Sequence, residues 1–302
     1  FLKNLRSITE EYLTYKKDKV RHVQIAFYGG NFLGLKKTLL KSLLSEAKKL
    51  TVEKKIDSIR FSTRPDTISE QLLDICKDYP VRTIEIGAQS MDDEVLLKSR
   101  RGHSSFATEK AVELVKKKNF ELGVQMMTGL PCDDEAKAFY TGKQIAKLEP
   151  DFVRIYPTVI LKNTLLERWF NKGEYKPFSL EKSVFIVKKL YLLFRSQKIK
   201  VIRMGLQSST ELDHGSVVIA GPYHPAFGHL VHSKIFFDLA ISAIKKKVFP
   251  GGSVIIMVHP KSVSKMRGIN NTNIKRLKDI FFLKKLRIIP NSSIAQDNIE
   301  VL

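Results

Sequence analysis

Five apolar runs constrain the fold of this 302-residue chain, because each one ends in a cluster of Gly, polar or charged residues. The clusters begin 24 to 40 residues apart, and amphipathic stretches lie between them. This spacing is typical of alternating strands and helices that form a parallel sheet. In such folds the functional residues lie where the strands pass into loops. In chain order, the runs end in AFYGGN, FSTRPD, EIGAQS, QMMTGLP and RIYPT.

The stretches between the runs have helical spacing. Apolar residues recur every three or four positions over residues 36–50, and similar patterns cover residues 106–118 and 134–148. Thr67 and Glu70 have the spacing of a capping box, so we expect a helix to begin there. The sequence therefore predicts successive strand–helix units whose strand carboxyl ends share one edge, where a site would lie.

The rhythm changes after Pro157, where a loop leads into a long apolar stretch over residues 180–197. The last hundred residues contain further short strand and helix patterns. We expect two domains: a partial barrel over residues 1–165 and a small α/β domain over residues 166–302.

The chain is strongly basic, with 52 Lys and Arg against 31 Asp and Glu and a formal charge of +21. Such a charge attracts polyanions such as RNA through their phosphates. The alternative is a solvated surface, because lysines are spread over every predicted helix. No apolar run approaches the roughly 18 residues of a membrane span, and no signal-peptide pattern is present. We therefore expect a cytoplasmic location and no membrane partner.

Glycines and polar groups close the first two runs. Gly29 and Gly30 would let a ligand approach the backbone, and a tight turn without a ligand is the alternative. Ser62, Thr63 and Arg64 end the second run, and their hydroxyls and guanidinium suit a carboxylate or a ribose. A capped loop with Arg64 in a surface ion pair is the other interpretation.

The third and fourth runs carry further candidates. Glu85 lies within a strand that we expect to be buried, so it should be paired or should face a ligand. Gln89 and Ser90 end the same run. Gln125 lies within the fourth run, where it could hydrogen-bond a ligand from inside a barrel or be a satisfied core amide.

Basic groups follow the third run. Arg101 and His103 could hold a carboxylate, or RRGH could end a helix with Gly102 in the left-handed conformation. A later group of histidines matches no metal site by its spacing, and we expect these residues to have loop and helix roles: His224, His229 and His232.

The order and the residues of these motifs resemble those of the radical S-adenosylmethionine (SAM) enzymes, in particular the bacterial group related to the radical SAM subunit of Elongator. AFYGGNFLGL is similar to the family's AFFGGSFTGL, STRPDTI to its STRPDYI, and GVQMMTGLP to its QMMVGLP. EIGAQSMDDEVL with RRGH is similar to its ELGVQSMDDEVL with RGHT. Further similarity over RIYPTVILKNTLLERWFNKGEYKP and AGPYHPAFGHLV extends the resemblance to nearly the whole chain.

The resemblance implies a partial TIM-like (β/α) barrel that lacks its first strand, followed by a small C-terminal α/β domain. It also implies radical chemistry, in which a [4Fe-4S] iron–sulfur cluster binds the methionine end of SAM and one electron yields a 5′-deoxyadenosyl radical. This radical would abstract hydrogen from a substrate that the sequence does not identify. Transfer RNA or another RNA is the expected substrate class, and a reductant protein is the expected partner.

The family pattern also implies a set of cosubstrate-binding residues. The glycine pair would hold the methionine amino end, and Arg101 would pair with the carboxylate. Asn31 replaces the Ser of the family, which is a mild change. The full set is Gly29, Gly30, Asn31, Ser62, Thr63, Arg64, Gln89, Ser90, Arg101 and Gln125.

The cysteines depart from the family pattern. Family members carry a Cys-x-x-x-Cys-x-x-Cys loop before the glycine pair, whereas this chain has only Cys76 and Cys132. Three thiolates are needed to hold the cluster, so we expect no metal ligand here. Because the chain opens on Phe1, we expect the ligands upstream of it in a longer protein, and this piece alone to be inactive. The alternative is a non-catalytic RNA-binding or protein-interaction scaffold derived from the same fold.

Overall fold

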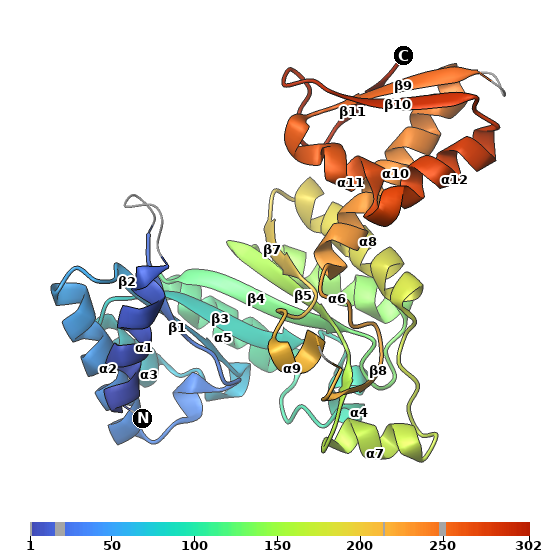
Figure 1. Cartoon of the computed structure of the whole chain (residues 1–302). Helices are drawn as coiled ribbons and strands as arrows, with labels where there is room; N and C mark the ends of the chain where they lie inside the picture. The colour runs from blue at the N-terminus through green and yellow to red at the C-terminus, as the bar shows by residue number, and fades with distance from the viewer. Residues whose placement is uncertain (1, 16–21, 214, 248–251) are drawn as a thin grey trace. The chain divides into compact units, whose positions relative to one another are not determined.

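The computed structural model describes residues 2–15, 22–213, 215–247 and 252–302 (Figure 1). The chain forms two compact units. The first comprises residues 1–155 and 193–202, and the second comprises residues 156–192 and 203–302. The domain boundary predicted between residues 165 and 166 stays a prediction.

A six-stranded sheet that curls into a half-barrel is the framework of the first unit (Figure 1). Its first four strands pair in parallel, with helices in the connections, so their carboxyl ends meet at one edge. This confirms the predicted partial TIM-like barrel. Across the sheet, the strands are β1 (Gln24–Phe27), β2 (Ser58–Thr63), β3 (Val81–Gln89), β4 (Glu121–Thr128), β5 (Phe152–Pro157) and β7 (Lys200–Met204).

Helices in the connections bury the apolar face of the sheet, with α5 on β3 and β4 and α6 on β4. Three of them match the predicted amphipathic stretches to within two residues. The helices are α1 (Leu2–Thr14), α2 (Lys37–Val52), α3 (Glu70–Lys77), α4 (Asp93–Lys98), α5 (Ser105–Lys117) and α6 (Glu135–Lys147), and two 3-10 turns are η1 (Phe32–Gly34) and η2 (Pro65–Thr67).

The capping box predicted at Thr67 and Glu70 is wrong. Helix α3 begins after Ser69, whose Oγ accepts a hydrogen bond from the N–H of Leu72. The Thr67 hydroxyl instead donates to Asn31 Oδ1 at 2.7 Å. The pattern failed because Ser69 offers the same capping chemistry two residues later.

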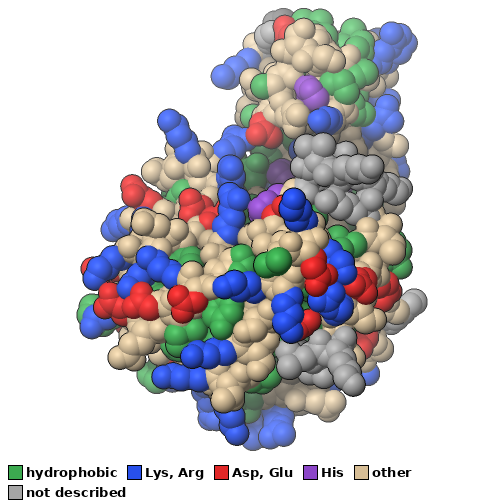
Figure 2. Space-filling view, turned by 90° about the vertical axis from the view of Figure 1, so that its left-hand side faces the viewer, with side chains coloured by type: hydrophobic (Ala, Val, Ile, Leu, Met, Phe, Trp, Pro, Cys, Tyr) green, Lys and Arg blue, Asp and Glu red, His purple; other side chains and the backbone are tan. Residues whose placement is uncertain are grey.

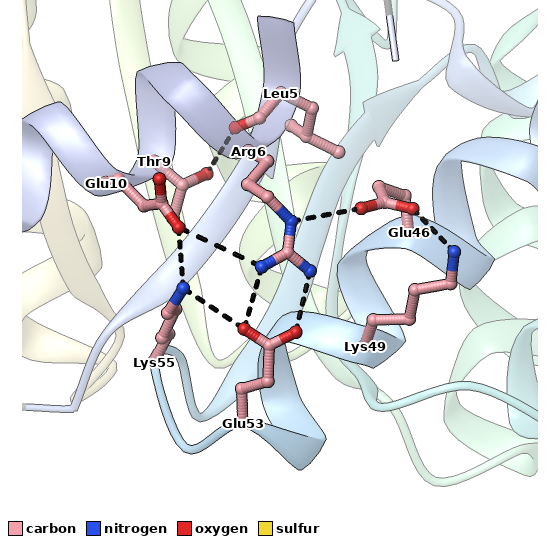
Figure 3. A network of polar contacts seen from close by, with 8 residues as sticks. All are labelled: Leu5, Arg6, Thr9, Glu10, Glu46, Lys49, Glu53 and Lys55. Atoms are coloured by element: carbon pink, nitrogen blue, oxygen red, sulfur yellow. Dashed lines mark hydrogen bonds and ion pairs between the residues drawn. The ribbon is translucent and has the colours of Figure 1, made fainter. Parts of the chain in front are cut away.

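Helix α1, which was not predicted from the sequence, is joined to α2 by ion pairs (Figure 3). Arg6 donates to both carboxylate oxygens of Glu53, at 2.6 and 2.8 Å, and its Nε lies 3.5 Å from Glu46. Lys55 bridges Glu53 and Glu10. Hydrogen bonds from Arg6 and then Lys55 lower the pKa of Glu53 to about 2. Exposed pairs add little stability, so their main effect is to neutralise the charges of this surface.

The second unit contains a three-stranded and a two-stranded sheet. Strand β10 (Lys285–Pro290) is parallel to β9 (Ser253–Val258), and β11 (Ile299–Val301) is antiparallel to β9. Buried residues of α10, α11 and α12 pack with β9, as in the cluster of Phe236, Met266 and Ile256, and Figure 1 shows these helices on one side of the sheet. This confirms the predicted small C-terminal α/β domain.

Apart from β7 and residues 193–196, the elements after β5 belong to this unit. None of the helices in the described residues combines the length and the apolar character that crossing a membrane requires. The elements are β6 (Ile160–Leu161), α7 (Leu165–Asn171), α8 (Leu180–Ser196), α9 (Thr210–Asp213), β8 (Val218–Ala220), α10 (Phe227–Lys247), β9 (Ser253–Val258), η3 (Pro260–Ser262), α11 (Val263–Arg267), η4 (Ile269–Asn271), α12 (Thr272–Phe281), β10 (Lys285–Pro290) and β11 (Ile299–Val301).

Candidate functional site

One face of the half-barrel sheet is polar, because alternate residues of neighbouring strands place polar side chains in rows across it. The row farthest from the carboxyl edge is a hydrogen-bonded chain. Gln24 Nε2 donates to Ser58 Oγ at 2.9 Å and to Thr83 Oγ1 at 3.3 Å, and Thr83 donates in turn to Glu121. This row closes the inner end of the polar face.

Glu85 is the centre of the middle row and is only 2% exposed. Arg60 Nη2 lies 2.8 Å from its Oε1, and Arg154 Nε lies 2.7 Å from its Oε2. Tyr28 donates its hydroxyl to Oε1 at 2.7 Å. A buried carboxylate is tolerated only when it is paired, so the prediction of a paired Glu85 is confirmed. Two guanidinium groups around one carboxylate leave a positive charge in this row.

The partners of Glu85 were missed in the sequence. Arg60, Glu85 and Arg154 each lie three or four residues before the end of their strands, and this shared depth was the signal that could have found them. Gly123 makes room for the cluster, because a Cβ there would lie 2.3 Å from the Phe152 ring and 3.0 Å from Glu85. The row therefore depends on a glycine as well as on its charges.

The third row lies at the carboxyl edge. Gln125 Nε2 donates to Gln89 Oε1 at 2.9 Å. A Cβ at Gly87 would lie 2.7 Å from Gln89 Nε2, so the missing side chain there lets the Gln89 amide lie across β3. Ser62 is paired in register with Glu85 and belongs to the same face. The structure thus brings the predicted residues Gln89 and Gln125 together and places Ser62 on the same face.

Asn31 organises the loop after β1. Its Oδ1 accepts hydrogen bonds from Thr63 Oγ1 at 2.9 Å, from Thr67 Oγ1 at 2.7 Å and from the Arg64 N–H at 3.3 Å. Thr63 is fully buried. Two of the predicted cosubstrate residues, Asn31 and Thr63, therefore join the loop to the end of β2.

The glycine pair in this loop leaves its backbone uncovered. A Cβ at either Gly29 or Gly30 would have no neighbour within 4 Å, and Gly30 has a φ of +89° that disfavours other residues. A ligand can approach the amide groups here without meeting a side chain.

Arg101 holds a partly buried positive charge in the turn after α4. Its Nε is buried without a hydrogen-bond partner among the described residues. Burial, and then repulsion from Arg64, lowers the pKa of Arg101. Arg64 itself pairs with Asp66 at 2.8 Å and lies against Gly102, where a Cβ would be 2.9 Å from its Nη2. The end of β2 therefore links the Asn31 loop to the turn that carries Arg101.

The RRGH segment does form a helix end. The Arg101 N–H donates to the Leu96 carbonyl at 3.0 Å, and Arg100, with a φ of 52°, takes the left-handed position that was predicted for Gly102. Gly102 also has a positive φ, of 73°. This cap involves only the backbone, so it leaves the Arg101 guanidinium available to an anion.

His103 and Ser90 lie beside the edge. His103 Nε2 lies 3.1 Å from the Ala88 carbonyl, and its Nδ1 is buried without a partner among the described residues. Burial lowers the pKa of His103, and Nδ1 of the neutral ring is an acceptor when Nε2 carries the proton. Ser90 instead lies against Thr141 of α6, with 3.1 Å between their hydroxyl oxygens.

Asp133 follows β4, and its Oδ2 accepts a hydrogen bond from the Gly129 N–H at 2.7 Å. Burial is the main cause that raises its pKa from 3.8 to about 7. The folded chain therefore binds a proton that the unfolded chain has lost, and stability should fall as the pH rises from about 4 to about 7. Replacing Asp133 with Asn should remove this loss, which has a slope of up to about 1.4 kcal/mol per pH unit.

Urea unfolding of both proteins at several pH values checks this expectation. The stability difference between D133N and the unchanged chain should grow from near zero at pH 4 to its maximum near pH 7. A difference that does not vary with pH would contradict a titrating Asp133.

The cysteines and histidines form no metal site in the part of the chain that the structure describes. Cys76 is buried, which raises its pKa to about 12, and Cys132 is exposed. His224 Nδ1 accepts a hydrogen bond from the Ala226 N–H at 3.0 Å, and the His232 ring packs edge-on against Tyr191. These two histidines have the loop and helix roles expected of them.

Two family domains match the sequence. The Radical SAM superfamily domain covers residues 2–140, and the Radical_SAM C-terminal domain covers residues 150–236. The tRNA uridine(34) acetyltransferase of Methanocaldococcus jannaschii is 30% identical over 48% of this chain and 28% of its own length. Human Elongator complex protein 3 is 28% identical over 45% of this chain and 25% of its own length. The chain thus spans less than half of these relatives.

A solved structure has the same fold. The archaeal Methanocaldococcus infernus Elp3 with an N-terminal deletion matches with a TM-score of 0.66 and 21% sequence identity, over 80% of this chain and 62% of that one. Fold, domain matches and relatives agree, and the chain therefore belongs to the radical SAM superfamily, with relatives among the Elp3 proteins.

Proposed function

We propose that the first unit binds SAM at the carboxyl edge of its sheet and serves a radical SAM enzyme that modifies RNA. The observation that carries the SAM site is Arg101, a cation with a buried, unpartnered Nε. Arg64 and Asn31 connect the turn that carries Arg101 to the loop with the uncovered backbone of Gly29 and Gly30. A carboxylate beside an amino group is the pattern that such a site would bind, and SAM carries both.

The residues fit the rest of SAM as well. Gln89 and Gln125 lie in the third row and Ser62 lies on the same face of the sheet, and their amides and hydroxyl suit a ribose or an adenine. The positive middle row beneath them favours a ligand that brings a negative group. Asn31, Thr63, Arg64 and Ser90 would then support the site through the loops that they fix.

The iron–sulfur cluster of the family does not fit these residues. Three thiolates are needed, whereas the chain has two cysteines, and burial keeps one of them, Cys76, protonated. The two cysteines of this chain therefore cannot hold a [4Fe-4S] cluster by themselves. The proposed catalysis belongs to a longer protein that supplies three cysteines, together with a reductant protein.

RNA is the proposed substrate class. The relatives act, by name, on tRNA uridine(34), and the charge of +21 suits a polyanion. Transfer RNA in the cytoplasm is thus the first substrate to test. Formation of 5′-deoxyadenosine from SAM by the longer protein, stimulated by tRNA, would support the proposal, and its absence from a folded, cluster-containing protein would contradict it.

The SAM site can be tested in this chain without catalysis. Gly29→Ala and Gly29→Val add side chains where the protein has open space, so stability should hardly change. SAM affinity, measured by calorimetry, should fall stepwise, by about tenfold or more for Val, because the side chain occupies the approach to the loop amides.

Thermal unfolding of the same variants is the control. If the unchanged chain binds no SAM at millimolar concentration, or if G29V binds it equally well, the proposed site is wrong.

A second candidate function follows from the cysteine count. A scaffold that binds RNA or protein without catalysis needs no cluster, which agrees with two cysteines in 302 residues. Such a scaffold has no need to bind SAM, so RNA binding without SAM binding would favour it.

A further inference from the structure

The positive charge of the chain is concentrated in its C-terminal half. Residues 1–160 contain 28 Lys and Arg against 22 Asp and Glu, whereas residues 161–302 contain 24 against 9. The first unit also neutralises its charges locally, as the α1–α2 network does, and the side of the molecule in Figure 2 shows acidic groups among the basic ones. By unit, the net formal charge is +9 for residues 1–155 and 193–202 and +12 for residues 156–192 and 203–302, so the second unit holds the larger share of the charge that could attract a polyanion.

Part of this surplus lies at one edge of the three-stranded sheet. Between residues 275 and 287 there are six Lys and Arg and one acidic residue, Asp279. Lys284 and Lys285 lead into β10, and the Lys284 N–H donates to the Gly252 carbonyl just before β9. Because β9 and β10 are parallel, both strands begin at this edge, where α12 also ends (Figure 1).

The basic groups here lack acidic partners. No ion pair joins Lys278, Lys284, Lys285 or Arg287 to an acid in the described part of the chain, and Lys284, Lys285 and Arg287 are exposed. One basic residue near a helix end is explained by the helix dipole. That explanation covers Lys278 in the last turn of α12 and does not extend to the three cations of β10 and its approach.

Phe282 lies among these cations and is 77% exposed. It caps α12 in the left-handed conformation, with a φ of 51° and a ψ of 39°, which is unfavourable for a bulky residue. Two hydrogen bonds hold the turn: the Leu283 N–H to Lys278 O, and the Lys284 N–H to Gly252 O. The turn thus holds Phe282 in solvent, in a segment flanked along the chain by Lys278 and Lys284, at some conformational cost.

We propose that this edge, made of Lys278, Phe282, Lys284, Lys285 and Arg287, docks single-stranded RNA. The exposed ring offers a stacking surface for a base, and the flanking cations contact the phosphates on either side. The edge lies outside both matched family domains. The inference rests on the proposed RNA substrate and adds a contact surface on the second unit.

The test uses the full chain and a fluorescent 12-nucleotide oligouridine. Phe282→Ala should weaken binding by about tenfold or more, because stacking of one base is lost, while Phe282→Trp should retain it. The double variant K284Q/K285Q should lower the slope of log affinity against log salt by about 1.4, since each phosphate contact to a single strand contributes about 0.7.

Matched controls are available on α5 of the first unit. Phe106 is 58% exposed beside Lys110, and Lys116 and Lys117 pair with acidic groups. F106A and K116Q/K117Q should leave oligouridine binding unchanged. Equal affinity of F282A and the unchanged chain overturns the proposal, as does an equal effect of F282A on polyglutamate, which has charge and no bases.

SAM binding measured on the same samples separates the two proposals. A chain that binds SAM and not oligouridine contradicts only the docking edge. A chain that binds oligouridine through Phe282 and not SAM supports the edge and contradicts the proposed enzyme.

Discussion

Replacing Glu85 with Gln is expected to lower the free energy of unfolding by about 3 kcal/mol, because it leaves two guanidinium groups buried beside each other without an anion. Arg60 and Arg154 are held by this carboxylate at 2.8 and 2.7 Å. The amide has nearly the same shape, so the loss reports charge and not volume. Urea unfolding followed by circular dichroism measures it.

A double-mutant cycle separates the ion pairs from general damage. Adding Arg154→Met to Glu85→Gln removes one of the two uncompensated cations, so the double variant should be more stable than the sum of the single effects predicts, by about 1 to 3 kcal/mol. Glu113→Gln on the exposed face of α5 is the control and should have little effect. Additive effects of Glu85 and Arg154 would show that the cluster is not an energetic unit.

The strand ends could be predicted from the sequence because period-2 burial and turn residues are local signals. Each of the five apolar runs forms a strand of the half-barrel sheet. Glu85 was expected to be paired or to face a ligand, and it is paired. The identity of that partner was not local. Arg60 comes from the neighbouring strand β2 and Arg154 from β5, beyond β4, and only the sheet order brings them to Glu85.

The hydrogen-bond partners of strand-end residues and the exposure of Phe282 could not be predicted, because both depend on the direction of a side chain in the fold. Thr63 and Ser90 were predicted to bind a cosubstrate, and this stays a prediction; their hydroxyls bond Asn31 and Thr141, partners that the sequence did not indicate. Phe282 attracted no notice in the sequence because its exposure depends on where α12 ends. A residue type is visible in the sequence, whereas its direction requires the fold.

Replacing Arg101 with Met is expected to weaken SAM binding about 100-fold, the effect of losing charge-assisted hydrogen bonds to a carboxylate. Arg101→Lys should recover only part of the loss, because an ammonium cannot reproduce the two-pronged contact of a guanidinium. Calorimetric titration with SAM measures both. Arg64→Met is the matched control and should weaken SAM binding less, since Arg64 already pairs with Asp66.

Stability distinguishes a binding role of Arg101 from a structural one. Burial and the neighbouring Arg64 disfavour the charged form of Arg101, as its lowered pKa shows, and its Nε has no partner in the described residues. Removing this charge should therefore leave the free energy of unfolding unchanged or raise it, in contrast to Glu85→Gln. A structural arginine would give the opposite result, with lower stability and unchanged SAM affinity. Loss of affinity without loss of stability is the result expected of a cation that binds the carboxylate of a ligand.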